Sequence, residues 1–338
     1  MAALFTEDRL QQVFNGFQGK RIAVVGDLMI DRYYWGTVRR ISPEAPVPVL
    51  EVESESHRLG GAANVAQNIQ ALGGNPLIVG LTGDDLNGSM LQAMLADQNL
   101  PVTGIVVDTG RPTTIKTRII AHQQHVVRVD QESRTECPEH LRHRIVDAVK
   151  YSIHQLDGII LEDYDKGTLS RDVIQEIVAV ARKYGKIVTV DPKLKNFLEY
   201  RNVTVFKPNR RETEESIGGR LDRIEDVERA GAKLIDVLSA ENVLITRGEE
   251  GMSLFSAGAQ PRHIPSAARH VHDVSGAGDT VISTITIAMA GGATFEEAAI
   301  LGNLAAGVVV GKVGIVPITA AELSEAALQA VRHEQPAG

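Results

Sequence analysis

The sequence predicts an α/β protein with a doubly wound, mostly parallel sheet flanked by helices, and a small β-sheet lid beside it. Short apolar segments alternate with helical periodicities along most of the chain, which is typical of βαβ units. Two segments break this alternation with period-two patterns and no helix between them. We therefore expect one domain over residues 1–338, with lid segments at about 32–56 and 111–131.

The expected strands are short apolar runs, and the expected helices lie between several of them. The strands fall at residues 21–26, 77–81, 158–161, 187–190, 203–206 and 243–246. The helices fall at 62–72, 173–184 and 227–238, and the first of them stops at Gly73-Gly74. Ligands of such sheets gather at the carboxyl ends of the strands, where the polar motifs of this chain also fall.

The two lid segments lie far apart in sequence but could pair into one separate sheet. Alternation is visible at Val47, Val49 and Glu51, and again at Ile115 and Ile119. A flap of this kind over a strand-end site would exclude water from a reactive phosphate. Its edges would need covering, so we expect a homodimer through the lid.

Bulk composition narrows the class of protein. The chain has 338 residues, 43% apolar and 23% charged, which are globular values. Its net charge of −8 argues against a nucleic-acid partner, so an anionic substrate must be held by local Lys and Arg. No apolar run approaches the length of a membrane span, and a single cysteine fits a reducing compartment. We expect a cytoplasmic protein that acts on a small molecule.

Residues 273–280, Asp-Val-Ser-Gly-Ala-Gly-Asp-Thr, are the most informative stretch for function. An apolar helical pattern follows, so a helix begins near Gly278 with its first N–H groups uncovered, which favours an anion. Glycines at 276 and 278 let a phosphate approach closely. Asp279 would repel that phosphate, but it is well placed to accept a proton from an attacking hydroxyl. The alternative is an ordinary first-turn acid that complements the helix dipole.

Two further groups could contact a hydroxylated substrate. Gly60 and Gly61 open a helix that carries Asn64 in its first turn, an arrangement that suits hydrogen bonds to a hydroxyl. A tight turn with a capping Asn explains the same residues. Asp27 and Asp31 follow the first strand and could bind neighbouring sugar hydroxyls, or they could belong to a solvated loop.

Two other groups suit a nucleotide. Asn209 and Glu212 follow a strand and could order Mg²⁺-bound waters and a phosphate, although a capping box explains them equally. Thr246, Gly248 and Gly251 suit phosphates or ribose, or a hairpin turn. The sequence contains no Walker lysine motif, zinc-ligand spacing or Ser-centred nucleophile elbow.

Taken together, these motifs resemble the ribokinase-like, or PfkB, family of carbohydrate kinases over residues of about 20–330. The glycine pair with Asn64 resembles the N-terminal signature of the family, and residues 273–279 resemble the C-terminal one. The elements around Asn209 and Thr246 lie between them in the family's order. The resemblance implies ATP and Mg²⁺, and a monovalent cation in part of the family.

The resemblance also implies roles for individual residues. Asp279 would be the catalytic base, and the N–H groups of Gly276, Ala277 and Gly278 would hold the transferring phosphoryl group. ATP would contact Asn209, Arg210, Arg211, Glu212, Thr246, Gly248, Gly251 and Asn303, with Glu212 meeting the metal through water. The sugar would contact Asp27, Asp31, Gly60, Gly61, Asn64, Lys116, Arg118, Asp163 and Lys193, with Arg128 as a further candidate cation.

Residues 25–33, 40–49 and 163–167 are similar to one branch of the family, the heptose 7-phosphate kinases of the ADP-heptose pathway. That branch phosphorylates the anomeric 1-hydroxyl of D-glycero-β-D-manno-heptose 7-phosphate, for the lipopolysaccharide inner core. The chain carries no His-x-Gly-His adenylyltransferase signature, so we expect a stand-alone kinase. Glu162 and Asp165 depart from the pattern of the branch and add negative charge.

Other functions stay open at this point. The nearest alternative is another sugar or nucleoside kinase of the same family. A silent sugar- or nucleotide-binding regulator belongs to a different class, and the intact Asp279 argues against it. An NAD-dependent enzyme is disfavoured because Gly60-Gly61 does not directly follow the first strand.

Overall fold

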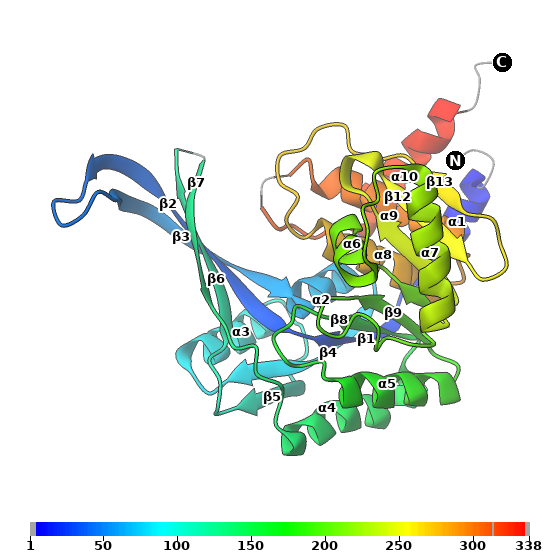
Figure 1. Ribbon diagram of the computed structural model, residues 1–338, viewed down its shortest axis with the longest axis horizontal. Helices are drawn as coiled ribbons and strands as arrows, with labels where there is room; N and C mark the ends of the chain where they lie inside the picture. Colours follow the sequence, from blue (N-terminus) through cyan, green and yellow to red (C-terminus); the bar gives the residue numbers. More distant parts are fainter. Residues whose placement is uncertain (1–4, 123, 313, 335–338) are drawn as a thin grey trace.

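The computed structural model describes residues 5–122, 124–312 and 314–334, and its centre is a nine-stranded sheet (Figure 1). The ends of the expected domain, residues 1–4 and 335–338, lie outside the described residues. The strand order is β13-β12-β11-β10-β9-β8-β1-β4-β5. In chain order these strands are β1 (Arg21–Gly26), β4 (Asn75–Gly83), β5 (Gly104–Asp108), β8 (Gly158–Glu162), β9 (Ile187–Asp191), β10 (Val205–Phe206), β11 (Asn242–Thr246), β12 (Met252–Ser256) and β13 (Arg262–Ile264).

Neighbouring strands from β5 to β11 are parallel, and β12 and β13 form an antiparallel edge. The expected doubly wound, mostly parallel sheet is therefore confirmed. Five of the six residues of β1 are buried, because helices cover both faces of the sheet. The strand expected at 203–206 is shorter than the apolar run, since only residues 205 and 206 pair with the neighbouring strands.

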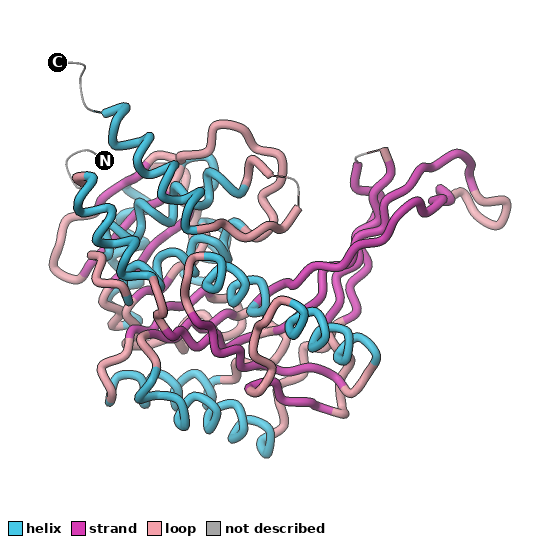
Figure 2. The backbone as a smooth tube through the Cα atoms, turned by 180° about the vertical axis from the view of Figure 1, so that it is seen from behind, coloured by secondary structure: helices cyan, strands magenta, loops and turns pink. Residues whose placement is uncertain are grey.

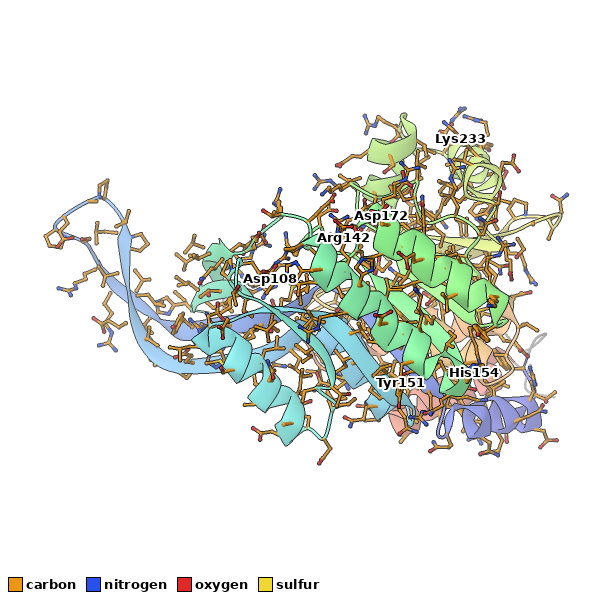
Figure 3. All side chains as sticks on the ribbon, turned by 90° about the horizontal axis from the view of Figure 1, so that it is seen from below. Asp108, Arg142, Tyr151, His154, Asp172 and Lys233 are labelled. Carbon is orange, nitrogen blue, oxygen red and sulfur yellow. The ribbon has the colours of Figure 1, made fainter. Side chains whose placement is uncertain are left out.

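Helices form a layer on each face of the sheet (Figure 1). One apolar core lies under α1 (Glu7–Phe17), α2 (Ala62–Ala71), α3 (Leu86–Asp97), α8 (Ala277–Ala290), α9 (Phe295–Val309) and α10 (Ala320–Glu334). The other lies under α4 (Glu139–Ser152), α5 (Arg171–Lys183), α6 (Arg210–Ile217) and α7 (Ile224–Leu238). On this second face Arg142 of α4 donates to Asp172 of α5 over 3.1 Å (Figure 3). No helix in the described ranges has the length and hydropathy that a membrane span requires.

Helix α8 is buried on every side although it is rich in Ser and Thr. Its hydroxyl groups are satisfied internally: Ser283, Thr284 and Thr286 each donate to the carbonyl four residues earlier. Thr286 also shares a hydrogen bond of 2.6 Å with Thr189 of β9. Because its hydroxyl groups are hydrogen-bonded, the helix can lie within the core. Its N-terminus then lies at the carboxyl ends of the strands.

The two β-rich segments form a separate four-stranded sheet, the lid, with the order β3-β2-β6-β7. Its strands are β2 (Leu28–Ile41), β3 (Pro48–Gly61), β6 (Thr114–Ala121) and β7 (Gln124–Gln131). β2 begins beside the main sheet and β3 ends there, so that Leu28 pairs with Gly61. From this point the lid extends away from the body (Figure 2). The base of the lid therefore borders the ends of the central strands.

Candidate active site

The N-terminus of α8 forms the floor of the site. Gly276, its N-cap, has a φ of 79°, a left-handed conformation that favours glycine. A Cβ there would lie 3.2 Å from the amide nitrogen of Asn64, so the position also needs glycine for space. The N–H of Ala277 makes only a long bond of 3.3 Å to the Val274 carbonyl. The first turn therefore presents donors and the positive end of the helix dipole, as an anion site requires.

Asp279, in the same first turn, is held by two donors from distant parts of the chain. Asn64 of α2 donates its amide N–H to Oδ2 over 2.6 Å, and the hydroxyl of Tyr164 donates to Oδ1 over 2.8 Å. The carboxylate is only 4% exposed. Burial raises the pKa of Asp279 to about 6, against the hydrogen bonds from Asn64 and Tyr164, which lower it. A group of that pKa is ionised near neutral pH and basic enough to accept a proton.

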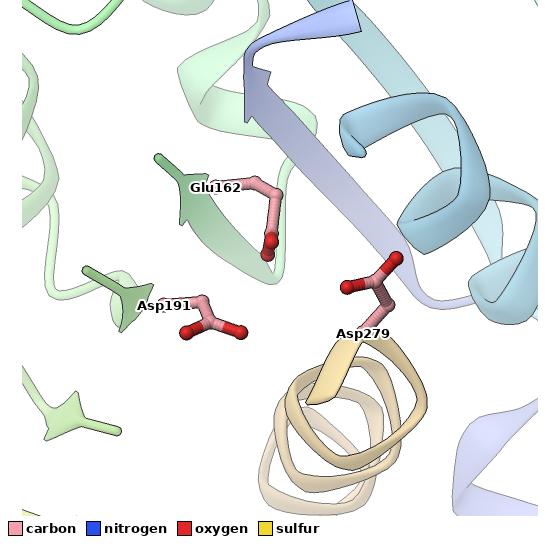
Figure 4. A group of neighbouring side chains, drawn as sticks. All are labelled: Glu162, Asp191 and Asp279. Carbon is pink, nitrogen blue, oxygen red and sulfur yellow. The ribbon is translucent and has the colours of Figure 1, made fainter. Parts of the chain in front are cut away.

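Three carboxylates meet beside this helix terminus: Glu162 at the end of β8, Asp191 at the end of β9, and Asp279 (Figure 4). Glu162 pairs with Asp191 in the register of the parallel strands, which brings both side chains to one level. One oxygen from each of the three lies within 4.8 Å of the others. Lys207, 3% exposed, forms an ion pair of 2.7 Å with Asp191. Burial, with the charges of Asp191 and Asp279, raises the pKa of the Glu162 carboxyl well above its usual range.

Asn209 and Glu212 form a capping box at the start of α6. The sequence allowed this capping box as the alternative to a role in ordering Mg²⁺-bound waters. Asn209 accepts from the Glu212 N–H, and one oxygen of Glu212 accepts from the Asn209 N–H. The other oxygen forms an ion pair with Lys193, which follows β9. Capping does not remove Glu212 from the site, because the paired Lys193 ammonium lies 5.3 Å from the ring centroid of Tyr164.

Tyr164 links Asp279 to the lid. Two ammonium groups lie near its ring: that of Lys116 on lid strand β6, 4.7 Å from the ring centroid, and that of Lys193, which follows β9. Among the described residues Lys116 forms no ion pair, and burial lowers its pKa. Arg118 and Arg128 are paired with Asp31 and Asp130 respectively. Lys116 is therefore the candidate cation with most freedom to meet an anionic substrate.

Asp27 and Asp163 are placed differently from the expectation that they contact sugar. The carboxylate of Asp27 accepts three backbone N–H groups, from Tyr164, Lys166 and Thr168, at 2.8 to 3.1 Å. Asp163 accepts from the Tyr200 hydroxyl at 2.6 Å. Both side chains are almost completely buried. They shape the loop that carries Tyr164, because buried acceptors take the nearest donors.

Asp31 and the glycine pair lie at the base of the lid. Asp31 is buried and forms an ion pair with Arg118 across the lid strands. A side chain at Gly60 would collide with the Asp31 carboxylate, and Gly61 has a φ of 57°. The glycines are therefore required by the turn from β3 into α2, which sets Asn64 beside Asp279. These residues lie at the base of the lid near Asp279, and their contact with a sugar stays a prediction.

The residues expected at the nucleotide fall into two groups. Thr246 ends β11, and Gly248 and Gly251 lie in the turn into β12, with φ of 61° and 88°. Arg210 pairs with Glu250 of this turn, whereas Arg211 is exposed and pairs with Glu215, away from the turn. Asn303 of α9 donates to the Pro265 carbonyl over 2.8 Å and lines a cavity of about 790 Å³. This cavity also contains Ala267, Gly307 and Gly311.

Sequence reasoning missed three members of the site: Tyr164, Lys207 and Asp191. The contact of Tyr164 with Asp279 joins residues 115 positions apart, and Asp191 meets Glu162 from the neighbouring strand. The available signal was position, since each follows or ends a strand of the central sheet. Lys207 directly follows β10 in the same way.

We expect Tyr164→Phe to lower kcat/KM by about tenfold to a hundredfold, because a hydrogen bond to a charged group contributes about 1.5–3 kcal/mol. The change removes only the hydroxyl that orients Asp279. Steady-state kinetics would measure the effect. Tyr184→Phe, at an exposed position after α5, is the matched control. Equal kinetics for Tyr164→Phe and wild type would show that the hydroxyl does not position the base.

A buried carboxylate beside a helix N-terminus, at the carboxyl edge of a parallel sheet, is an arrangement that suits phosphoryl transfer. The comparisons agree with this class. The model of the pfkB family carbohydrate kinases matches residues 20–320, and the chain belongs to that family. It is a carbohydrate kinase with the ribokinase-like fold.

The curated relatives include two bacterial proteins, each named bifunctional protein HldE. The one from Desulfatibacillum aliphaticivorans is 44% identical over 307 residues, 91% of this chain and 63% of its own length. The one from Geobacter sulfurreducens is 45% identical over 300 residues, 89% of this chain and 61% of its own length. The chain thus spans about three fifths of these relatives.

Solved structures with the same fold are more distant in sequence. Arabidopsis thaliana ribokinase, complexed with ribose and ATP, has a TM-score of 0.72 at 20% identity and covers 91% of this chain and 98% of its own. Phosphofructokinase-2 from Escherichia coli has a TM-score of 0.77 at 20% identity, with 93% and 99% covered. These likenesses confirm the fold.

Proposed function

We propose that the chain transfers the γ-phosphoryl group of ATP to the anomeric 1-hydroxyl of D-glycero-β-D-manno-heptose 7-phosphate, giving the 1,7-bisphosphate of the ADP-heptose pathway. The observation that carries the choice of sugar is the similarity of residues 25–33 and 40–49 to that branch of the family. The HldE relatives, 44% and 45% identical, support it over the same part of the chain. Their second activity is not part of the proposal.

In the proposed reaction, Asp279 accepts the proton of the attacking hydroxyl. Asn64 and Tyr164 fix both of its oxygens, so the remaining lone pairs face a defined direction. The N–H groups of the first turn of α8 stabilise charge on the transferring phosphoryl oxygens. The lid would exclude water from the reacting phosphate. The cavity lined by Asn303 is the proposed site of the adenine and ribose.

The residues present fit Mg²⁺ bound with ATP. Glu212 keeps free lone pairs after its cap and its ion pair, which suits hydrogen bonds from metal-bound waters. When bound, Mg²⁺ neutralises charge on the phosphates. Lys193 holds Glu212 in place, so the carboxylate is already oriented before nucleotide arrives.

We expect Glu212→Gln to raise the Mg²⁺ concentration needed for half-maximal rate by about tenfold, as losses of outer-shell metal partners do. The KM for sugar should change less, because the side chain contacts metal-bound water and not the acceptor. An amide oxygen can still cap the helix, so folding should be unaffected. Glu215→Gln on the same helix is the matched control. An unchanged Mg²⁺ titration with a weaker sugar KM would assign Glu212 to the acceptor.

We also propose a homodimer through the lid. The lid exposes large apolar side chains, among them Ile41, Val52 and Val129, each more than half exposed. Strands β3 and β7 leave unpaired edges in the described sheet, and such edges favour association. Analytical ultracentrifugation should show twice the chain mass of 36.5 kDa, and Val129→Glu should shift it toward the monomer. A wild-type monomer at enzyme concentrations would reject this assembly.

The function is tested by a coupled ADP-release assay with four acceptors: heptose 7-phosphate, ribose, fructose 6-phosphate and adenosine. We expect kcat/KM to be highest with heptose 7-phosphate. A higher value with fructose 6-phosphate or adenosine would favour the alternative, another kinase of the same family. No ATP turnover with any acceptor would indicate a binding protein.

A further inference from the structure

Arg58 is a lid residue that contacts the body of the protein. It lies near the end of β3, where it pairs in register with Asp31 of β2. Its Nη1 donates to the carbonyl of Ile315 over 2.6 Å. Residue 315 lies in the segment between α9 and α10. The hydrogen bond therefore joins the lid to a loop of the body, across 257 positions of the chain.

Three contacts orient the guanidinium of Arg58. The Ile315 carbonyl accepts its N–H, and its central carbon lies 5.9 Å from the ring centroid of Tyr33 on β2. A Cβ on Gly314 would lie 3.1 Å from the same carbon, so the guanidinium occupies the space that a side chain there would fill. Gly314 also has a φ of 75°, a left-handed conformation that favours glycine. The side chain of Arg58 is thus already oriented before substrate binds.

Ile315 extends this contact to the first turn of α8. Its side chain is 9% exposed, and a Cβ on Gly276 would lie 3.2 Å from its Cγ2. Gly276 is the N-cap of α8, the position at which the candidate anion site begins. Arg58 and Gly276 therefore contact different parts of the same residue: the guanidinium holds the carbonyl of Ile315, and the side chain of Ile315 packs against Gly276.

The other end of this segment is tied to α8 through α2. The N–H of Ile318 donates to Oδ1 of Asn68 over 3.3 Å, and the hydroxyl of Thr280 donates to the same oxygen over 3.3 Å. Asn68 is completely buried, and hydrogen bonds in such a low-dielectric interior are stronger than in water. The body therefore holds the segment at Ile318, and the lid holds it at Ile315.

The position of Gly276 matters because the first N–H groups of α8 must meet charge that develops during the transfer. Such donors accelerate a reaction when they already point at the oxygens of the transferring group. A displacement of about 1 Å can cost about a hundredfold in rate. The rate is affected more than substrate affinity, since these interactions are stronger in the transition state than in the bound substrate.

We propose that Arg58 is a positioning residue for phosphoryl transfer. By holding Ile315 against Gly276, it keeps the N-terminus of α8 in the geometry that the transferring group requires. The inference rests on the proposed function of that helix terminus and adds a residue of the lid to it. The lid then has a second role beside the exclusion of water, because one of its side chains shapes the anion site.

The first test replaces Arg58 by an unbranched side chain without a donor. We expect Arg58→Met to lower kcat by about tenfold to a hundredfold, as displaced groups of an active site do, with smaller changes in the KM for ATP and sugar. Arg58→Lys retains a donor for the Ile315 carbonyl and should recover part of the rate. Arg39→Met, at an exposed arginine of lid strand β2, is the matched control and should have wild-type kinetics. A lysine variant no faster than Arg58→Met would show that the hydrogen bond is not the cause.

A double-mutant cycle tests the route through Ile315. Ile315→Ala removes the side chain that packs on Gly276 and should itself lower kcat. If Arg58 acts through Ile315, the double variant should lose little more than the larger single change, because coupled residues are not additive. The proposal is overturned if Arg58→Met keeps wild-type kcat, even with a lower Tm, or if the two losses simply multiply. All variants are compared on the acceptor that wild type prefers, so a different sugar would refute the proposed function and leave this comparison intact.

Discussion

Asp279→Asn is expected to abolish most of the turnover, with kcat lower by about 10²–10⁴-fold, the usual loss when a general base is removed. The amide has nearly the same shape and can keep both contacts, because its oxygen accepts from Asn64 and its nitrogen donates to the Tyr164 oxygen. It cannot accept the proton of the sugar hydroxyl. Steady-state kinetics with MgATP would measure the loss.

ATP binding, followed by calorimetry, should be spared in Asp279→Asn, because the helix donors are unchanged. Asp236→Asn, an exposed acid on α7, provides the control for the same chemical change. Retention of more than about a tenth of wild-type kcat would contradict the role of Asp279 as base, since base catalysis contributes at least about a hundredfold.

Lys116→Ala is expected to raise the KM for heptose 7-phosphate by about tenfold to a hundredfold, because one charge-assisted bond contributes about 1.5–3 kcal/mol. The ammonium lies near the ring of Tyr164, whose hydroxyl donates to Asp279, and it forms no ion pair among the described residues. With a net charge of −8, only such local cations can hold a dianionic acceptor. The effect should shrink with the unphosphorylated heptose.

Arg128→Ala is the natural control for Lys116→Ala, because this arginine is also on the lid but is exposed and paired with Asp130. Arg118→Ala and Lys193→Ala complete the series, although each also leaves a buried carboxylate without its partner. If Lys116→Ala binds both sugars as wild type does, the 7-phosphate is held elsewhere and the substrate orientation is wrong.

Much of the fold follows from local patterns in the sequence. The strand at residues 21–26 is visible as a short apolar run, and the helix that follows Gly276 is visible from apolar residues at helical spacing. The lid was predictable because apolar residues recur at every second position in its two segments, which contain no helical pattern. Pairing β2 with β6, however, joins residues more than 80 positions apart, and only the tertiary structure sets that register.

The site was predictable where one motif carries both backbone and chemistry, as at Gly276 and Asp279. The site was less predictable where a polar residue that follows a strand can either contact a ligand or accept hydrogen bonds from the backbone of a loop. Asp27 looked like a sugar ligand, yet its carboxylate caps the N–H groups of the loop that carries Tyr164. Local sequence cannot separate these cases, since the donors come from residues more than 130 positions away.

Glu162 shows the opposite difficulty. In the sequence it is a single departure from the expected pattern, with no partner nearby to suggest a role. Its meaning depends on Asp191 from the next strand and Asp279 from α8, which the fold brings within 4.8 Å. Only the three-dimensional arrangement shows that it is buried beside two other carboxylates.

The most direct measurement is phosphorus NMR of the product formed from heptose 7-phosphate and MgATP. The proposed reaction predicts one new phosphate signal coupled to the anomeric proton, with ADP released in equal amount. A new phosphate on any other carbon, or ADP release without a new sugar phosphate, would contradict transfer to the 1-hydroxyl.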